Sequence, residues 1–411
     1  MKRSWFAIKN TVYVNWQEKG TLFLYDTKSG RHLTSHQSKA IELAKAVYIP
    51  ENLGVVDLGT IDLDDEMQIF IKNICENNLG LLFDKEQCPQ KPINFLPILN
   101  LQNDVERMSE IGEYIMLGEI INNYLTHAVL HIGTVCQQSC PNCGLWGKQF
   151  LCCEKTEISA FMPIERLKDL VKQLSYTSVK VIDLIGGDLC LYPDKEALVA
   201  LIKEHPQFNW HLWQHAMICG NSPFANDVVC TDILLPMPFV GSELLKSVAT
   251  NTKVKIHAIV EDEEQVAQAE ELLSAIGISD YELHPFYTTS NLGFFEDNVF
   301  LNEDDIMSAP VSMREIFCHQ KLNTNYFGVL HFFANGEVKA DVNGETVGMF
   351  PEKSVLELIY EELLHNTAWR RIRGGTRCLG CRFRYLCPSP GNYETVIGKE
   401  NLCHVQPMRE S

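Results

Sequence analysis

Long apolar runs are missing from this 411-residue sequence. No stretch of about 18 apolar residues occurs, so we expect no membrane-spanning helix. The opening segment MKRSWFAIKN places Lys2 and Arg3 near its start, but no apolar stretch follows them. It therefore does not have the pattern of a secretory signal. These absences favour a cytoplasmic protein.

Positive charge is also scarce. The chain has 35 Lys and Arg against 53 Asp and Glu, which gives a net charge of −18. Such a surface repels phosphate backbones, so nucleic acid is not expected as the main partner. Apolar residues make up 45% of the chain, which indicates a globular protein rather than a disordered one. The length allows two or three domains with a large core.

Cysteine, in contrast, is abundant, with fifteen in the chain. Without a secretory signal, a disulfide framework is not expected, and metal or cluster binding is the better interpretation. The pair Cys152 and Cys153 is interpreted as two ordinary loop thiols, with an active-site thiol as the alternative. Cysteines scattered along the chain are expected to be small core or half-buried residues. They are Cys75, Cys88, Cys190, Cys219 and Cys230.

Three cysteines form a compact C-x3-C-x2-C run directly after an apolar segment at 128–135. They are Cys136, Cys140 and Cys143. Three thiolates on one loop can bind three irons of a 4Fe-4S cluster, and the fourth iron is then open to a small molecule. The alternative is a zinc site, because C-x2-C is also common among zinc ligands.

From residue 127 onward, strand and helix patterns alternate. Strands are expected at 128–135, 179–184, 210–218, 228–235, 254–260 and 281–287, with helices at 163–174, 194–203, 242–249 and 262–276. Six such units fit a partial (β/α)6 TIM-like barrel, an α/β fold. The cysteine loop follows the first strand, and Gly186, Gly187 and Asp188 follow the second. The carboxyl ends of parallel strands meet at one edge, so we expect these two segments to be neighbours.

This combination resembles the radical S-adenosylmethionine (SAM) enzymes. The resemblance implies that the open iron chelates the amino and carboxylate groups of SAM. One electron then splits SAM into methionine and a 5′-deoxyadenosyl radical. Gly186-Gly187-Asp188 resembles the GGE motif of the family, whose acid binds the SAM ammonium; Asp is one methylene shorter than Glu. A tight turn is the alternative interpretation of a glycine pair alone.

Three further residues are interpreted through this resemblance. Asn142 stands where the family usually has an aromatic residue before the last cysteine. Trp146 is predicted to supply an aromatic surface for adenine. Gln214, in the third strand, occupies a position where the family contacts ribose or methionine. The strand histidines, in contrast, are expected to be satisfied core residues rather than ligands or bases. They are His211, His215, His257 and His284.

A second cysteine arrangement lies near the carboxyl terminus. It consists of Cys378, Cys381, Cys387 and Cys403. The spacing resembles the SPASM extension of radical SAM peptide-modifying enzymes, which implies one auxiliary 4Fe-4S cluster on these four residues. A second, inner cluster is predicted to be absent. Cys318 matches its first ligand, but Asp341 and Gly391 stand at two later ligand positions. Four thiolates suit zinc equally well, so zinc remains an alternative.

The rest of the chain divides around these motifs. Residues 1–83 are expected to form a small α+β unit, with strands at 11–16, 21–25 and 81–83 and helices at 38–47 and 64–78. This order resembles the winged-helix domain that binds a leader peptide along a sheet edge. A plain accessory domain is the alternative. Residues 84–126 are interpreted as a linker and bridging helix (105–123), 127–290 as the barrel, and 291–411 as the SPASM-like domain.

The segments at 285–345 and around CRFRYLCPSPGNY resemble peptide maturases of the GG-Bacteroidales type, a group that includes pseudo-radical-SAM members. The resemblance implies an enzyme that abstracts a hydrogen from a residue of a ribosomally made precursor peptide. It also implies an electron donor such as flavodoxin or ferredoxin. The alternative is a catalytically silent metal-binding partner that binds precursor peptide for another maturase.

Overall fold

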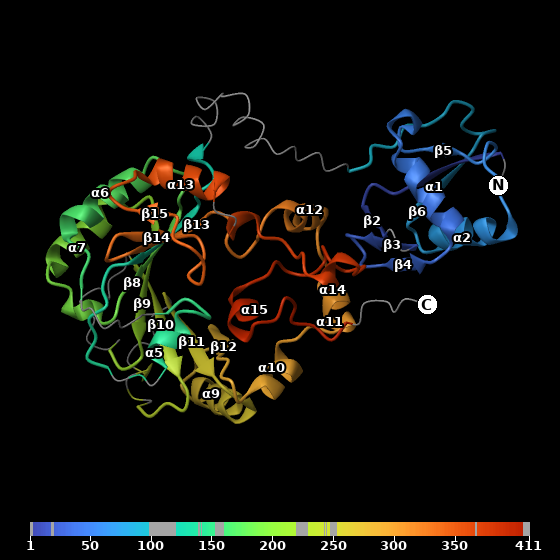
Figure 1. Ribbon diagram of the computed structural model, residues 1–411. Helices are drawn as coiled ribbons and strands as arrows, with labels where there is room; N and C mark the ends of the chain where they lie inside the picture. Colours follow the sequence, from blue (N-terminus) through green and yellow to red (C-terminus); the bar gives the residue numbers. More distant parts are fainter. Residues whose placement is uncertain are drawn as a thin grey trace.

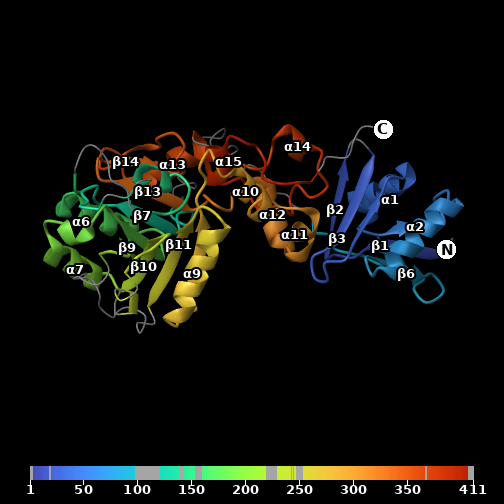
Figure 2. The same cartoon turned by 90° about the horizontal axis from the view of Figure 1, so that it is seen from below.

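The computed structural model describes residues 3–17, 20–97, 121–138, 140, 142–152, 160–218, 229–241, 243, 245–246, 253–365 and 368–405. The described parts form three regions in a row (Figures 1 and 2). A barrel-like α/β region lies at one end and a small N-terminal unit at the other. Helices and loops from the last third of the chain lie between them. Among the described helices, none is long and apolar enough to cross a membrane.

The α/β region contains a nine-stranded sheet in the order β12-β11-β10-β9-β8-β7-β13-β14-β15. Its first six strands in sequence are parallel neighbours. They are β7 (His127–His131), β8 (Val181–Ile185), β9 (Asn209–His215), β10 (Val229–Pro236), β11 (Val254–Val260) and β12 (Tyr281–Pro285). The six expected parallel strands are confirmed, although β7 ends at His131 rather than at Val135.

Three strands beyond residue 290 also join this sheet, which the sequence did not indicate. β13 (Val329–Phe333) runs parallel to β7, while β14 (Glu337–Lys339) and β15 (Gly348–Met349) continue antiparallel. They cover the β7 edge of the six-stranded sheet, which would otherwise present unpaired backbone groups. A segment far along the chain therefore lies beside the strand that leads into the cysteine loop.

Amphipathic helices cover the outer face of the sheet. They are α6 (Ile164–Leu174), α7 (Lys195–Glu204), α9 (Glu263–Ala275) and α13 (Val355–Leu364). The buried stripe of α6, exemplified by Leu167 and Leu170, recurs every three or four residues and packs in the same core as the outward side chains of β7 and β8. Asp262 caps α9 by accepting a hydrogen bond from Gln265, and Gly277 ends that helix with a φ of 78°.

The N-terminal unit has two small three-stranded sheets and two helices around one core. One sheet contains β1 (Ser4–Ile8), β5 (Val56–Asp57) and β6 (Gly80–Asp84), the other β2 (Val12–Gln17), β3 (Thr21–Asp26) and β4 (His32–Ser35); the helices are α1 (Ser38–Tyr48) and α2 (Asp65–Glu76), with η1 (Pro50–Asn52) between them. The expected strands and both expected helices are confirmed. β1, β4 and β5 were not expected, because each is short and lacks a clear alternation.

The N-terminal unit packs on the cysteine-rich C-terminal region, which contains α10 (Leu292–Asn298), α11 (Glu303–Ser308), α12 (Met313–Lys321), η4 (Ala368–Arg370), α14 (Thr376–Leu379) and α15 (Asn392–Ile397). The Phe23 ring lies edge-on to Phe383, with their centroids 5.4 Å apart. The hydroxyl of Tyr25 accepts a hydrogen bond of 3.2 Å from the Val311 N–H. These residues belong to one buried apolar cluster, so the contact between the two regions is a packed hydrophobic interface.

Two expected helices cannot be followed in full. The bridging helix at 105–123 lies outside the described residues except for its last three positions, and only parts of 242–249 are described. Residues 85–97 contain no helix or strand, as expected for a linker.

Candidate functional site

The cysteine loop begins where β7 ends. Thr134 fixes its start by exchanging hydrogen bonds with Ala160: its N–H donates to the Ala160 carbonyl at 2.9 Å, and its hydroxyl accepts from the Ala160 N–H at 3.0 Å. The chain then reaches Cys136 and Cys140, and Cys143 opens the short helix α5 (Cys143–Trp146). All three thiols are half-buried.

One thiol of this loop already accepts a backbone hydrogen bond. The Gln138 N–H lies 3.3 Å from the Cys136 sulfur. Hydrogen bonds of this kind stabilise a thiolate and tune the potential of an iron–sulfur cluster. This hydrogen bond would favour the thiolate form of Cys136.

The glycine turn after β8 lies directly against this loop. The Gly187 N–H donates to the Gly133 carbonyl at 3.0 Å, and the Asp188 N–H donates to the Val135 carbonyl at 2.7 Å. A Cβ atom on Gly187 would lie 2.3 Å from the Val135 oxygen and 2.9 Å from the Cβ of Cys136. The expected proximity of the two segments is confirmed, and only glycine permits this approach.

The carboxylate of Asp188 is buried and has a local partner. It accepts a hydrogen bond of 2.9 Å from the Cys190 N–H and so caps the short helix η2 (Leu189–Leu191). Its residual exposure is 8%. Capping a helix is a structural role of Asp188. If this carboxylate also binds the ammonium group of a ligand, it must do so while it accepts the hydrogen bond from Cys190.

Side chains at and just beyond the end of the cysteine loop form hydrogen bonds with the ends of two other barrel strands. The Asn142 side chain donates to Glu261, beyond β11, at 3.4 Å. The Gln149 side chain exchanges two hydrogen bonds, of 2.9 and 2.7 Å, with the backbone of Tyr287, beyond β12. Burial raises the pKa of Glu261 above its usual value. These hydrogen bonds hold the segment around α5 at the carboxyl ends of the neighbouring strands β11 and β12.

Trp146 lies inside the barrel rather than at an open face. Its exposure is 3%, and its ring meets Phe286 edge-on at 6.2 Å within an apolar cluster that includes Trp213. The indole N–H is buried without a hydrogen-bond partner among the described residues. Gln214 is also buried on β9 and alternates with Trp213, so it faces away from that cluster.

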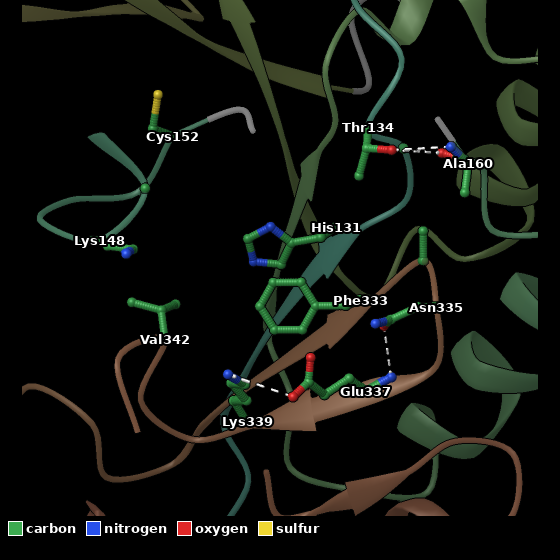
Figure 3. A pocket seen from close by; sticks show the side chains of 13 residues that line it. His131, Thr134, Lys148, Cys152, Ala160, Phe333, Asn335, Glu337, Lys339 and Val342 are labelled. Carbon is green, nitrogen blue, oxygen red and sulfur yellow. Dashed lines mark hydrogen bonds and ion pairs between the residues drawn. The ribbon is translucent and has the colours of Figure 1, made fainter. Parts of the chain in front are cut away.

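A cavity of about 530 Å³ lies beside the start of the cysteine loop (Figure 3). Its walls come from the ends of β7 and β13, from β14 and from the segment after α5. They include Thr134, Lys148, Cys152, Phe333 and Lys339. The Cys152 side chain thus belongs to the cavity wall, whereas Cys153 lies outside the described residues.

The floor of the cavity is an uncharged aromatic platform. The rings of His131 and Phe333 are stacked, with centroids 4.3 Å apart, and Figure 3 shows them side by side. The Nε2 of His131 lies 3.1 Å from the Nδ1 of His331. Burial lowers the pKa of His131 to about 3 and that of His331 well below its usual value, so both rings are neutral. The sequence analysis did not identify His131 and His331 as site residues. The alternation of side chains along β7, which places His131 on the inner face of the barrel, was the signal that could have identified His131.

The inner face of the barrel is polar on several strands. The Trp213 N–H donates to Asp183 at 2.8 Å, and Asp183 also pairs with His127. Asp232 is bonded to His211 at 2.7 Å and to His257 at 2.9 Å. The strand histidines expected to be satisfied do have partners. His211, His257 and His284 belong to one network that includes Asp232, whereas His215 accepts a hydrogen bond of 3.1 Å from the Met217 N–H.

The four C-terminal cysteines line a single cavity together with three arginines. The cysteines are Cys378, Cys381, Cys387 and Cys403, and the arginines are Arg373, Arg377 and Arg384. The Asn401 side chain donates to the Cys403 sulfur at 3.2 Å. Burial raises the pKa of Cys387 to about 12 and also raises those of Cys378 and Cys381. These thiols would become thiolates at neutral pH only with a bound cation.

Zinc and a four-iron cluster require different spacings of their cysteine sulfurs. Among the described residues, which include all seven cysteines, no three of their sulfurs lie within 4.8 Å of one another. A tetrahedral zinc with Zn–S bonds of about 2.3 Å would hold thiolates roughly 3.8 Å apart. A four-iron cluster separates them further, because each sulfur binds a different iron.

Ion pairing occupies one position expected of an inner-cluster ligand. Asp341 is 2% exposed and lies 2.9 Å from the guanidinium of Arg371, which in turn covers the Tyr326 ring. Gly391 begins α15, and Cys318 is half-buried on α12. A carboxylate paired with arginine is not available as a cluster ligand; the absence of the inner cluster stays a prediction.

Comparisons with known proteins give limited similarity. No family model and no curated protein sequence matches the chain. Among solved structures, it is similar to Streptococcus suis SuiB bound to S-adenosylmethionine, with a TM-score of 0.47 and 13% identity over 98% of this chain and 100% of that one. SuiB bound to the precursor peptide SuiA gives a TM-score of 0.46 and 13% identity over 99% of each chain. Methylornithine synthase (PylB) gives 0.29 and 14% over 47% of this chain and 63% of that one.

Proposed function

We propose that this chain is a radical SAM enzyme that modifies a ribosomally made precursor peptide. The proposal rests on one arrangement: the C-x3-C-x2-C loop follows β7, and the glycine turn after β8 is hydrogen-bonded to that loop. Cys136, Cys140 and Cys143 would hold a 4Fe-4S cluster. When bound, the cluster supplies the electron that splits SAM into methionine and a 5′-deoxyadenosyl radical.

The neighbouring residues have roles in binding and orientation. Gly186 and Gly187 allow close backbone approach to the cofactor, and Asp188 contacts its ammonium while capping η2. Trp146 is proposed near its adenine and Gln214 near its ribose or methionine part, as the resemblance implies; both side chains are buried. The cavity above His131 is a suitable place for the reacting peptide residue, because it lies beside the start of the cysteine loop and has an aromatic floor of His131 and Phe333, with charged Lys148, Glu337 and Lys339 on its walls.

The C-terminal cysteines are proposed to hold one auxiliary 4Fe-4S cluster. The arginines around the cavity support this choice, because the guanidinium groups offset the negative charge of a four-thiolate cluster. This region would then be a SPASM-like extension. Flavodoxin or ferredoxin is the proposed electron donor.

The N-terminal unit is proposed as a winged-helix-like leader-binding domain. Among the described residues, β4 is paired on one side only, with β3, so its other edge is free to accept an extended peptide. Backbone hydrogen bonds to such an edge supply affinity with little dependence on sequence.

A second candidate function is a catalytically silent partner that binds precursor peptide for another maturase. Two observations favour it. Asn142 is engaged with Glu261 where the resemblance implies an aromatic residue, and Asp188 is engaged with Cys190 where it implies a longer acid. In this function the cluster or metal would only stabilise the fold.

Anaerobic reconstitution tests both candidates. The enzyme should be brown, absorb broadly near ~400 nm, and form 5′-deoxyadenosine from SAM when reduced with dithionite. Replacing Cys136, Cys140 and Cys143 by Ala should remove about four irons per chain and abolish 5′-deoxyadenosine. Cys75→Ala, on α2 of the N-terminal unit, is the matched control and should change neither quantity.

The outcomes separate the candidates. A fully loaded protein that forms no 5′-deoxyadenosine supports the silent partner. A colourless protein that takes up zinc but no iron contradicts both cluster assignments. Iron content unchanged by the triple substitution contradicts the assignment of the loop.

A further inference from the structure

The last two strands of the barrel bring together three side chains of a kind that bind transition metals. His257 lies on β11, and Glu282 and His284 lie on β12. The Nδ1 of His257 is 2.9 Å from the Nε2 of His284, and each of these nitrogens is 3.6 Å from the same oxygen of Glu282. Among the described residues, this is the one group of three or more such side chains whose ligand atoms all lie within 4.8 Å.

A buried carboxylate fixes the orientation of the central ring. Asp232 is 3% exposed, and one of its oxygens lies 2.9 Å from the Nε2 of His257, while the other lies 2.7 Å from the Nδ1 of His211. Burial raises the pKa of Asp232, but hydrogen bonds from the two histidines lower it overall, so the group is an ionised acceptor. His257 must therefore donate from Nε2, which leaves the Nδ1 lone pair directed at His284.

The second ring presents its Nε2 to the same place, 2.9 Å from the Nδ1 of His257 and 3.6 Å from the Oε2 of Glu282. Two imidazole nitrogens and one carboxylate oxygen then surround one point. A carboxylate that orients a histidine through its other nitrogen is the usual support of a zinc ligand.

We propose that His257, His284 and Glu282 form a Zn²⁺ site, with Asp232 as the residue that positions His257. Two histidines, one carboxylate and an open fourth position for water match a common zinc donor set. Solvent reaches the site, because the side chains of Glu282 and His284 are 50% and 22% exposed. Zn–N bonds of about 2.0–2.1 Å at a tetrahedral angle hold the two nitrogens about 3.4 Å apart, so His284 must move about 0.5 Å away from His257 while Glu282 moves slightly closer, which the exposure of both side chains allows.

The competing arrangement needs no metal. In it, His284 donates an N–H to His257, and Glu282 is neutralised by Lys255, whose Nζ lies 2.5 Å from its other oxygen. Lys255 does not block the proposed zinc site, because it binds Oε1 of Glu282 while the two histidines face Oε2. The two arrangements make different predictions: only the first binds Zn²⁺, and only in the first does Lys255 lower the affinity for Zn²⁺ by competing for Glu282.

Zinc content and zinc titration of the full chain distinguish them. The protein is first reconstituted so that its cysteines are occupied, and Zn²⁺ is then added and unbound metal removed. We expect about one Zn²⁺ per chain fewer in Glu282→Gln and His284→Gln than in the wild type. Asp232→Asn should weaken Zn²⁺ binding about 10- to 100-fold. His365→Gln, an exposed histidine after α13, is the matched control and should bind as the wild type does.

Co²⁺ substitution identifies the donor atoms. The spectrum lost on His284→Gln should contain no sulfur-to-metal band, because no thiolate belongs to this site. Equal zinc in the wild type and in folded Glu282→Gln and His284→Gln overturns the proposal. If neither variant folds, Lys255→Met decides: releasing Glu282 should tighten Zn²⁺ binding, and unchanged or weaker binding overturns the proposal.

Discussion

Gly187 and Val135 are in contact through their backbones: a Cβ atom added to Gly187 would lie 2.3 Å from the Val135 carbonyl oxygen. Because backbone cannot move aside cheaply, Gly187→Ala should displace the start of the cysteine loop. We expect a loss of about 1–3 kcal/mol in the free energy of unfolding, as for an overpacked core. Iron bound by the loop should fall with it, measured as metal content after reconstitution.

Gly144→Ala is the matched control for that substitution. Gly144 lies next to Cys143 on α5, and a Cβ atom there would meet nothing within 4 Å. Alanine favours a helix by up to about 1 kcal/mol over glycine, so iron content should be kept. Equal behaviour of the two variants would show that the contact with Val135 does not hold the loop.

Substitutions of Asp188 can distinguish its role as the cap of η2 from a proposed charged contact with the ammonium group of SAM. Asp188→Asn keeps a side-chain oxygen for the Cys190 N–H but removes the charge, so stability should change by less than about 0.5 kcal/mol. If Asp188 binds the ammonium group, SAM affinity should fall about tenfold or more in Asn and Ala alike. Asp188→Ala should in addition lose about 1 kcal/mol of stability. Calorimetric SAM binding unchanged in the Asn variant would assign Asp188 to the cap alone.

Glu362 should make the stability of the barrel depend on pH. It is fully buried on α13, where it accepts a hydrogen bond of 2.8 Å from the Trp369 N–H, and burial raises its pKa to about 7. A raised pKa in the folded state means that its contribution is fully present below about pH 4.5 and is lost as pH rises through 7. The loss at higher pH is up to about 3 kcal/mol.

Thermal unfolding at pH 5 and pH 8 checks this contribution. The difference between the two should shrink in Glu362→Gln, which cannot ionise. Glu361→Gln, a neighbour paired with Lys353 and partly exposed, should keep the wild-type difference. An identical pH dependence in Glu362→Gln and the wild type would contradict the assignment.

Phe23 should couple the N-terminal unit to the cysteine-rich region. It is 1% exposed, and its ring lies against Phe383, between Cys381 and Cys387 in the chain. Phe23→Ala should cost about 3–5 kcal/mol and release the N-terminal unit. Limited proteolysis within 84–126 should become faster. Tyr176→Ala, which removes a ring that is 65% exposed and lies outside 84–126, is the control and should leave the proteolysis rate unchanged.

Periodicity and turn residues were enough to place most elements of the barrel. The stripe of α6 and the glycine after α9 are local signals, and helix ends depend on such signals. β13 was missed because its pairing with β7 joins residues about 200 positions apart in the chain, such as Phe333 and His131. The cysteine loop and the glycine turn were found from spacing, but the local partners of Asn142 and Asp188 were not.

The sequence by itself determined the composition of both cysteine sets, the α/β alternation and the need for glycine beside the first set, because each depends on residues close together in the chain. Only the tertiary structure decided which distant groups meet: Asn142 with Glu261, Phe23 with Phe383, and His257 with Glu282 and His284. The sequence pattern around a histidine in a strand does not show whether its neighbour on the adjacent strand is a leucine or a second histidine. Strand order and register choose that neighbour, and they follow from packing of the whole sheet.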